Sequence, residues 1–233
     1  MAAAFCFQGK RGVSHGRVGE EPTKQEREEI ILKKIICIVL ASVMLFVITS
    51  VVSDAAITHT VERGDSLWKL AVKYQVGLSE IKAANPTIKN YDLIYPGQQI
   101  NIPTISSLTT AFEAEVVHLV NQRRAEHGLK PLIQDWQLSR VARYKSQDMK
   151  DLGYFSHTSP TYGSPFQMMK SFGISYRTAG ENIAKGYASP EAVVNAWMNS
   201  PGHRANILNS TYTHIGVGYV PSGNYWTQMF ISK

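Results

Sequence analysis

The hydrophobic positions along the chain follow three different patterns. From Ile35 to Val52 the sequence is almost continuously apolar, and Lys33 and Lys34 come directly before this run. Residues 57–103 pass from alternation to helical spacing and back to alternation, while residues 111–230 show helical spacing first and strand-like segments last. Because each pattern predicts a different kind of structure, we expect a targeting segment, a small module and a larger module.

The N-terminal apolar run is typical of a targeting segment. Small residues stand before a cleavage point after Ala55, as in a secretory signal peptide, and the run is also just long enough for an uncleaved membrane anchor. In both cases the preceding lysines stay in the cytoplasm and the chain after residue 55 is exported. Residues 1–55 are therefore assigned to an N-terminal extension with a signal peptide or membrane anchor. Because residues 1–31 are long and polar for a signal peptide, we expect translation to start at Leu32.

The pattern of residues 57–103 predicts the order strand, helix, helix, strand. Ser66 is placed to cap the first helix and Ser79 the second, and Asn85-Pro86 ends the second helix. Trp68 and Tyr74 are expected in the core. Two strands of this length must pair and be covered by the helices, because nothing else in the module can bury their apolar face.

Several short sequences in this module resemble the LysM domain. They are His59-Thr60-Val61, Gly64-Asp65-Ser66-Leu67-Trp68, Ala84-Asn85-Pro86, Ile94-Tyr95-Pro96-Gly97-Gln98 and Ile100-Asn101-Ile102-Pro103. The resemblance implies binding of N-acetylglucosamine-containing glycans, either peptidoglycan or a chitin-like glycan. It also implies a shallow groove between two loops, formed by Gly64, Asp65, Ser66, Leu67, Leu93, Ile94, Tyr95 and Pro96.

After a linker at residues 104–110, the second module at 111–233 predicts helices followed by a hairpin. Helices are expected before Gly128, after Asp135, and from two Ser-Pro pairs in which serine caps and proline takes the first helical position. Residues 215–220 and 225–231 read as strands joined by a turn. The fold class is therefore α+β, with helices packed on a small antiparallel sheet.

Candidate chemistry in the second module gathers at Ser156-His157, Gly180-Glu181-Asn182 and Gly202-His203-Arg204, which we expect in loops or at helix ends. His157, Glu181 and His203 are suited to general acid–base catalysis, or to a divalent metal such as zinc held by His157 and His203. In a third interpretation each histidine only braces a loop. His118, His127 and His214 are expected to have structural roles.

Four segments of the second module resemble the CAP superfamily, also called SCP-like extracellular or pathogenesis-related-1-like. They are Phe155-Ser156-His157, Ala179-Gly180-Glu181-Asn182-Ile183-Ala184, residues 196–208 and His214-Ile215-Gly216-Val217-Gly218-Tyr219. The resemblance implies an α-β-α sandwich with a large cleft, in which His157, Glu181 and His203 match three of four family residues. The fourth, a glutamate, falls at Ser200, and the lost carboxylate weakens the case for a bound dication.

Composition narrows the function classes. Hydrophobic residues make up 44% and charged residues 18% of the chain, which excludes wholesale disorder. The net charge is +6, but no basic block follows residue 34, so nucleic-acid binding has no support. Cys6 and Cys37 both precede the cleavage point, which leaves no disulfide in the mature chain and suits export from a Gram-positive cell.

Together these observations predict an exported or cell-wall-associated protein that touches the membrane only through an uncleaved N-terminal segment. The first module would bind wall glycan, and the second would present a cleft. For that cleft we favour a binding or scaffold role over two alternatives: a hydrolase of wall or protein that uses His157, Glu181 and His203, and a carrier of lipid or small ligands. Vegetative wall and spore cortex both stay open as targets.

Overall fold

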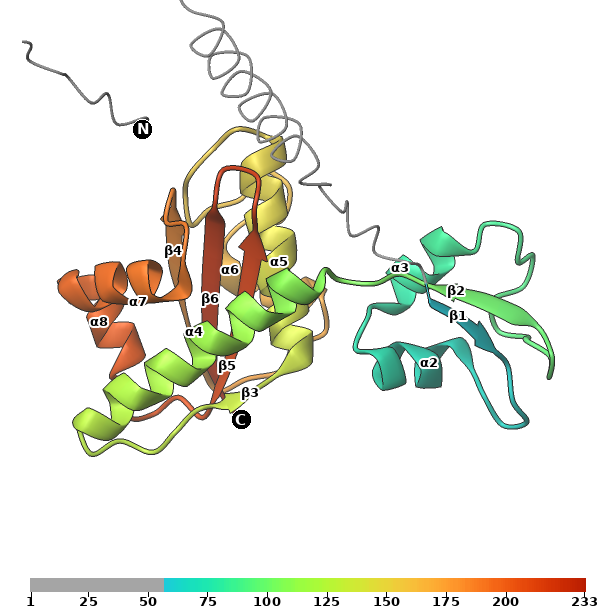
Figure 1. Ribbon diagram of the computed structural model, residues 1–233, viewed down its shortest axis with the longest axis horizontal. Helices are drawn as coiled ribbons and strands as arrows, with labels where there is room; N and C mark the ends of the chain where they lie inside the picture. The colour runs from blue at the N-terminus through green and yellow to red at the C-terminus, as the bar shows by residue number, and fades with distance from the viewer. Residues whose placement is uncertain (1–56) are drawn as a thin grey trace, which may run out of the picture. The chain divides into compact units, whose positions relative to one another are not determined.

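The computed structural model describes residues 57–233 (Figure 1). The signal peptide or anchor and the start at Leu32 lie outside the described residues. Within residues 57–233, no helix is both long enough and apolar enough to cross a bilayer.

The first module has the predicted order of strand, helix, helix, strand. Strand β1 (Ile57–Thr60) pairs antiparallel with β2 (Gln99–Ile102), and helices α2 (Leu67–Tyr74) and α3 (Leu78–Ala84) lie between them in the chain. Ser66 caps α2 as expected, because its side chain accepts a hydrogen bond from the Lys69 amide. The module buries its own apolar core, formed by Val61, Leu67, Leu70, Ala71, Val76, Ile81, Ile100 and Ile102.

Two expectations for this module were wrong. Trp68 is 63% exposed rather than buried. The buried face of α2 holds Leu67, Leu70 and Ala71, and a residue one step from Leu67 is rotated by about 100° away from that face. The second helix begins after Gly77, not at Ser79, and Gly77 makes no side-chain cap.

The second module contains a four-stranded sheet with strand order β3-β5-β6-β4. Strands β5 and β6 form the predicted antiparallel hairpin, β4 pairs antiparallel with β6, and the short β3 pairs parallel with β5. The elements in chain order are α4 (Ser107–Glu126), β3 (Ile133–Gln134), α5 (Trp136–Asp151), α6 (Pro165–Ser171), β4 (Thr178–Lys185), α7 (Pro190–Asn199), α8 (Pro201–Ile207), β5 (His214–Val220) and β6 (Tyr225–Ser232).

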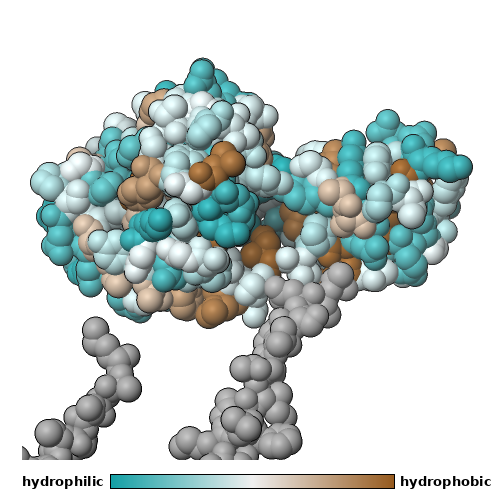
Figure 2. All heavy atoms as spheres, turned by 90° about the horizontal axis from the view of Figure 1, so that it is seen from above, coloured by the Kyte–Doolittle hydropathy of each residue, from teal (hydrophilic) through white to brown (hydrophobic). Residues whose placement is uncertain are grey.

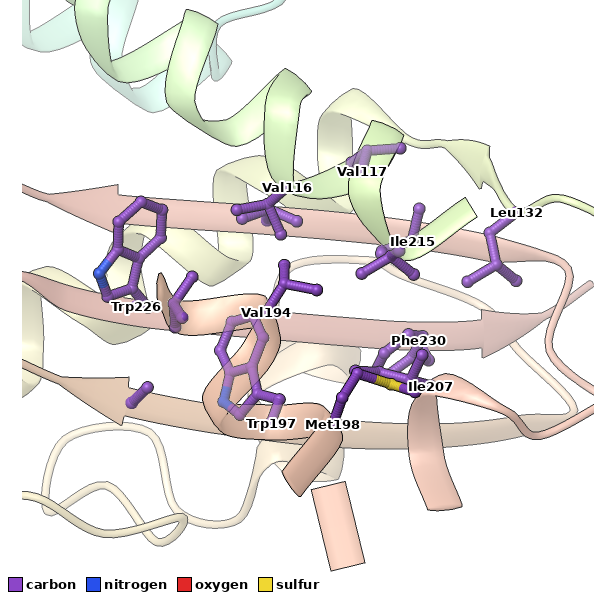
Figure 3. Close-up of a cluster of buried hydrophobic side chains, with 14 of the residues drawn as sticks. Val116, Val117, Leu132, Val194, Trp197, Met198, Ile207, Ile215, Trp226 and Phe230 are labelled. Atoms are coloured by element: carbon purple, nitrogen blue, oxygen red, sulfur yellow. The ribbon is translucent and has the colours of Figure 1, made fainter. Parts of the chain in front are cut away.

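Helices cover both faces of this sheet, which gives an α-β-α sandwich (Figure 1). On one face, Val116 of α4 and Trp197 of α7 pack against β5 and β6, as Figure 3 shows. On the other face, helices α5 and α6 pack against Met229 and Ile231 of β6. Neighbouring residues of β6 therefore serve opposite layers, as strand geometry requires.

The structure differs from the expectations at four places in this module. The first is the short strand β3, which was not predicted and whose parallel pairing with β5 makes the sheet mixed rather than purely antiparallel. Strand β4 and helix α8 were not predicted as elements, and β4 holds Gly180, Glu181 and Asn182, which are poor strand formers. Its conformation comes from pairing along its whole length with β6. Helix α4 begins at Ser107, inside the stretch expected as linker, because Ser106 caps it.

One face of the described residues, drawn in Figure 2, mixes polar and apolar side chains. On the face drawn in Figure 2, brown hydrophobic patches are small and lie between teal and white residues. Large exposed apolar side chains include Trp68 and Tyr95 in the first module and Phe155 in the second. Single exposed apolar residues are normal, so these positions matter only where another feature points to a ligand.

Candidate functional site

Glu181 is the buried centre of the candidate site. It lies in strand β4, opposite Met229 of β6, and not in a loop as its neighbours in sequence had indicated. Its side chain is 1% exposed. Because residues in direct register point to the same face of a sheet, Glu181 faces the layer of α5, the helix directly before the His157 loop.

His157 reaches Glu181 from that loop. Its Nδ1 lies 2.8 Å from Oε1 of Glu181, while the side chain is 53% exposed. A buried carboxylate thus fixes the orientation of an exposed imidazole and leaves Nε2 turned to other partners. Such an arrangement is able to accept or donate a proton at Nε2, provided that a substrate reaches it.

The second oxygen of this carboxylate is unusual. Oε2 of Glu181 is buried and has no hydrogen-bond partner in the described structure. Burial raises the pKa of Glu181, although the His157 hydrogen bond and the charge of Lys145 both act to lower it. A buried carboxylate oxygen without a partner is costly for folding, which is typical of a functional position.

His203 lies in α8, on the other side of β4. The side-chain amide of Asn182 donates to the His203 carbonyl at 3.1 Å, and Asn182 follows Glu181 and so points to the opposite face of the strand. Burial, together with the charge of His157, lowers the pKa of His203. We therefore expect a neutral His203 at pH 7. Among residues 57–233, no hydrogen bond joins its side chain to His157 or Glu181.

A cavity of about 270 Å³ adjoins His203. Its lining includes Ser200, the buried Trp197, and the aromatic rings of Phe155 and Tyr187, which are 50% and 38% exposed. No carboxylate lines the cavity. Its size suits one ring or side chain of a larger ligand rather than a whole substrate.

The donor set does not form a metal centre by itself. Nδ1 of His157 is already occupied by Glu181, and Ser200 brings no charge. Across residues 57–233, no three His, Cys, Asp or Glu side chains are grouped so that they could hold a metal ion. Zinc bound by His157 and His203 alone stays a prediction.

The remaining histidines of the second module make other contacts, and one of them, His127, reaches the residue after His203: its Nε2 lies 2.9 Å from the Arg204 guanidinium. His118 contacts Gln122 on the exposed side of α4, and His127 at the end of α4 contacts the Arg123 carbonyl. His214 begins β5 and contacts the Thr213 hydroxyl. Structural roles for these three histidines stay a prediction.

In the first module, the predicted glycan groove is built on a hydrogen-bonded loop. Oδ2 of Asp65 accepts from the Glu62 amide at 2.9 Å and contacts Nε2 of His59 at 2.8 Å. Nδ1 of His59 contacts the Tyr74 hydroxyl at 2.9 Å. Asp65 therefore braces the loop between β1 and α2, so only part of its hydrogen-bonding capacity is left for a sugar.

The other predicted groove residues divide into exposed and buried ones. Leu93 and Tyr95 are 50% and 60% exposed in the loop before β2. The Leu67 side chain is 2% exposed and belongs to the core. Only its main chain is left for a ligand.

Comparison with known proteins places both modules. The family model of the LysM domain matches residues 59–103, and that of the CAP family, described as the cysteine-rich secretory protein family, matches residues 117–231. The chain carries a LysM domain followed by a CAP domain. The order predicted from the sequence is thereby confirmed, and the LysM domain is a module that binds peptidoglycan-type glycans.

Individual relatives each match part of the chain. The uncharacterised protein YkwD of Bacillus subtilis is 68% identical over 127 residues, which are 54% of this chain and 49% of YkwD. The N-acetylmuramoyl-L-alanine amidase sle1 of Staphylococcus epidermidis is 32% identical over 88 residues, 38% of this chain and 26% of the amidase. A solved extracellular protein with an SCP domain from Bacillus anthracis aligns with a TM-score of 0.53 and 35% identity, covering 59% of this chain and 47% of that protein. The chain spans about half the length of YkwD.

Two residues that contact the CAP site were not predicted from the sequence. Lys145 and Asp148 lie on α5 and hold the loop that carries His157. A signal for Lys145 was present, because it continues the inward row of Leu138, Val141 and Ala142 at helical spacing. A lysine on the buried face of an amphipathic helix is rare unless it is paired.

The Asp65 contacts predict loss of LysM binding in acid. Hydrogen bonds from the Glu62 amide and from His59 lower the pKa of Asp65. A carboxyl group whose pKa is lowered in the folded protein stabilises the fold at pH values above its ordinary pKa. This stability is lost as the pH falls through the lowered pKa. Sedimentation with cell-wall sacculi should therefore show binding that declines below about pH 4. The Asp65→Asn variant should bind more weakly at pH 7 and lack this acid step, and an unchanged step in the variant would contradict the assignment.

The buried Glu181 predicts a gain in stability when its charge is removed. Its raised pKa means that the folded chain binds this proton more tightly than the unfolded chain, so stability falls as the pH rises from the ordinary toward the raised value. Glu181→Gln keeps an oxygen for His157 and should stabilise the CAP domain by about 1 kcal/mol at pH 7. Thermal melting should show the gain at pH 7 and a smaller gain at pH 4. The exposed Glu191→Gln is the control, and a destabilised Glu181→Gln would contradict the prediction.

Proposed function

We propose that this is an exported cell-wall protein in which the LysM domain holds the chain on peptidoglycan and the CAP domain presents a ligand-binding cleft. The contact between exposed His157 and buried Glu181 is the observation that carries the second half of the proposal. Oε1 of Glu181 orients the His157 imidazole, while Oε2 of the same carboxylate has no hydrogen-bond partner in the described residues. Such a site costs stability, so a ligand is the best reason for its presence.

Three observations support a binding role for the cleft. Ser200 stands where the CAP resemblance places a further carboxylate, and the cavity beside His203 is lined by aromatic rings and Lys185 but by no carboxylate. The hydroxyl of Ser156, next to His157, accepts a hydrogen bond from the Thr158 amide and is not paired with a base. No activated nucleophile is therefore assembled around His157 in the described residues.

A wall or protein hydrolase is the second candidate. A carboxylate that orients an imidazole is a common arrangement for activating a water molecule, with Nε2 of His157 as the base. The partial similarity to a wall amidase is consistent with a wall substrate, although that match covers only part of either chain.

The deciding experiment uses the chain from residue 56 on, which contains both modules and their cores. The protein is incubated with Gram-positive sacculi, pelleted, and the supernatant is analysed by mass spectrometry. Protein in the pellet with intact wall supports the binding role. Soluble muropeptides that disappear with Glu181→Ala or His203→Ala, but not with the exposed control His118→Ala, would make the CAP domain a hydrolase.

The same experiment tests attachment through the LysM domain. Tyr95→Ala removes an exposed ring from the predicted groove and is expected to weaken pelleting about tenfold, which corresponds to about 1.4 kcal/mol. Leu152→Ala removes an exposed apolar side chain from the CAP domain and is the matched control. Equal binding of both variants would move the glycan site away from Tyr95.

A further inference from the structure

The loop that carries His157 has an unusual number of supports for a segment without helix or strand. Residues 154–161 follow α5, and His157 itself is exposed. An exposed side chain in such a loop is normally mobile, which would blur its contact with Glu181. Here two side chains of α5, Lys145 and Asp148, hold the loop by hydrogen bonds.

Lys145 supplies the first support. It is 0% exposed, and its ammonium donates to the His157 carbonyl at 2.9 Å and to the Tyr154 hydroxyl at 3.1 Å. A buried ammonium group is costly unless acceptors and opposite charges surround it. The carboxylates of Glu181 and Asp148 provide that charge. Lys145 therefore holds the backbone of His157 by a hydrogen bond. It also interacts electrostatically with Glu181, the residue that the His157 side chain contacts.

Asp148 supplies the second support. It accepts hydrogen bonds from the Ser159 hydroxyl at 2.7 Å and the Thr161 hydroxyl at 2.6 Å, and from the hydroxyl of Tyr154. Lys145 and Asp148 are three residues apart, which places them on one face of α5. Their contacts lie on both sides of His157 in the loop, and both residues bind the Tyr154 hydroxyl.

We propose that Lys145 and Asp148 are positioning residues of the CAP cleft, and that they hold the His157 loop so that the imidazole stays on Glu181. Neither residue needs to touch a ligand. Only the expected effect of these two residues on ligand binding or turnover rests on the proposed function. The effect on the His157 ring is a property of the protein alone.

The test is a nitrogen-15 NMR measurement of the histidine rings at pH 7.5, made on the chain from residue 56 on. In the wild type, His157 should show one fixed tautomer with the proton on Nδ1, because the Glu181 carboxylate accepts it. In Lys145→Met, which keeps the buried volume and removes the donor, this signature should be lost, while the signals of the exposed His118 on α4 stay in place. Lys150→Met, on the exposed side of α5, should leave both rings unchanged.

A milder variant covers the case in which Lys145→Met does not fold. Thr161→Val removes one hydrogen bond to Asp148 at an exposed position, so the domain should remain folded while His157 shifts in the same direction by a smaller amount. A folded Lys145→Met or Thr161→Val with wild-type His157 signals would overturn the inference. Because no ligand is used, this result is independent of the sacculus experiment and of the role finally assigned to the cleft.

Discussion

Gly218→Ala is expected to destabilise the CAP domain by roughly 3 kcal/mol or more. A Cβ atom at this position would lie 2.1 Å from the Arg143 amide nitrogen and 2.2 Å from the Ala142 carbonyl carbon. Both are main-chain atoms of α5, so no side-chain rotation can relieve the clash. The helix would have to move away from the sheet, which opens the core between them.

Thermal melting measures this effect, and a fall in Tm of order 10 °C corresponds to the expected loss. Gly216→Ala should behave similarly, because its Cβ would lie 2.4 Å from main-chain atoms of Leu138 and Ser139. Gly202→Ala is the matched control, since an added Cβ there meets nothing within 4 Å and its backbone is not left-handed. A Gly218→Ala variant that melts with the wild type would show that α5 does not pack this closely on β5.

These two glycines show what the sequence could and could not predict. Their alternation with Ile215 and Val217 predicted a strand, and that strand is confirmed as β5. The alternation did not predict why the two middle positions of the other face, 216 and 218, are both glycine. The reason is a tertiary contact, because α5 approaches the sheet on that face too closely for a side chain.

The site residues divide in a similar way. His157, Glu181 and His203 were found from their short motifs, and the structure places His157 on Glu181. The strand conformation of Glu181 was missed because its neighbours have low strand propensity and are held by β6. Lys145 was missed because its partners, the His157 carbonyl and the Tyr154 hydroxyl, are recognisable only once the loop has folded back on α5.

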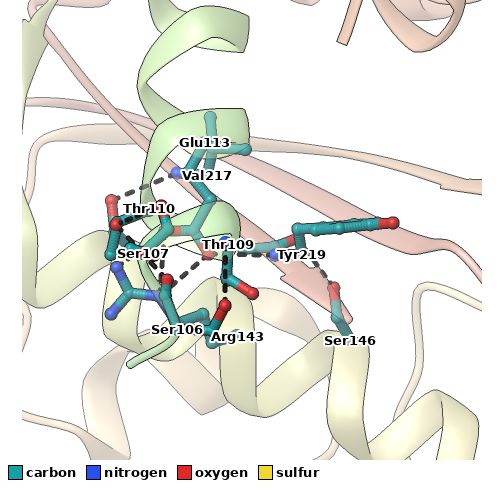
Figure 4. Close-up of polar contacts among 11 residues, drawn as sticks. Ser106, Ser107, Thr109, Thr110, Glu113, Arg143, Ser146, Val217 and Tyr219 are labelled. Atoms are coloured by element: carbon teal, nitrogen blue, oxygen red, sulfur yellow. Dashed lines mark hydrogen bonds and ion pairs between the residues drawn. The ribbon is translucent and has the colours of Figure 1, made fainter. Parts of the chain in front are cut away.

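Glu113→Ala is expected to cost about 3–5 kcal/mol of stability. Glu113 in α4 is 1% exposed, and its carboxylate accepts from Arg143 Nε at 2.9 Å and Nη2 at 2.7 Å. It also accepts from the Tyr219 amide of β5 at 3.1 Å. Figure 4 shows these contacts, which join helices from opposite layers past the edge of β5 that β3 leaves open. The alanine variant leaves Arg143 without its partner and the buried amide without an acceptor.

Two further variants separate charge from hydrogen bonding. Glu113→Gln keeps an acceptor for the Tyr219 amide and should lose less stability than Glu113→Ala. Glu126→Ala removes an ion pair with Arg123 whose side chains are 37% and 53% exposed, and should change stability by no more than about 1 kcal/mol. Urea unfolding gives all three values. If Glu113→Ala were as stable as Glu126→Ala, the buried pair would contribute nothing to the joining of the layers.

The Glu113 result also bears on the cleft, because Arg143 lies on the same helix as Lys145 and Asp148. Loss of the Glu113 contacts acts on the whole domain, so it should lower the melting temperature while leaving the His157 ring signature intact below the transition. Loss of the Lys145 contacts should change that ring signature well below the melting temperature. Measuring both properties on both variants therefore separates the interactions that hold the sandwich together from those that hold the imidazole on its carboxylate.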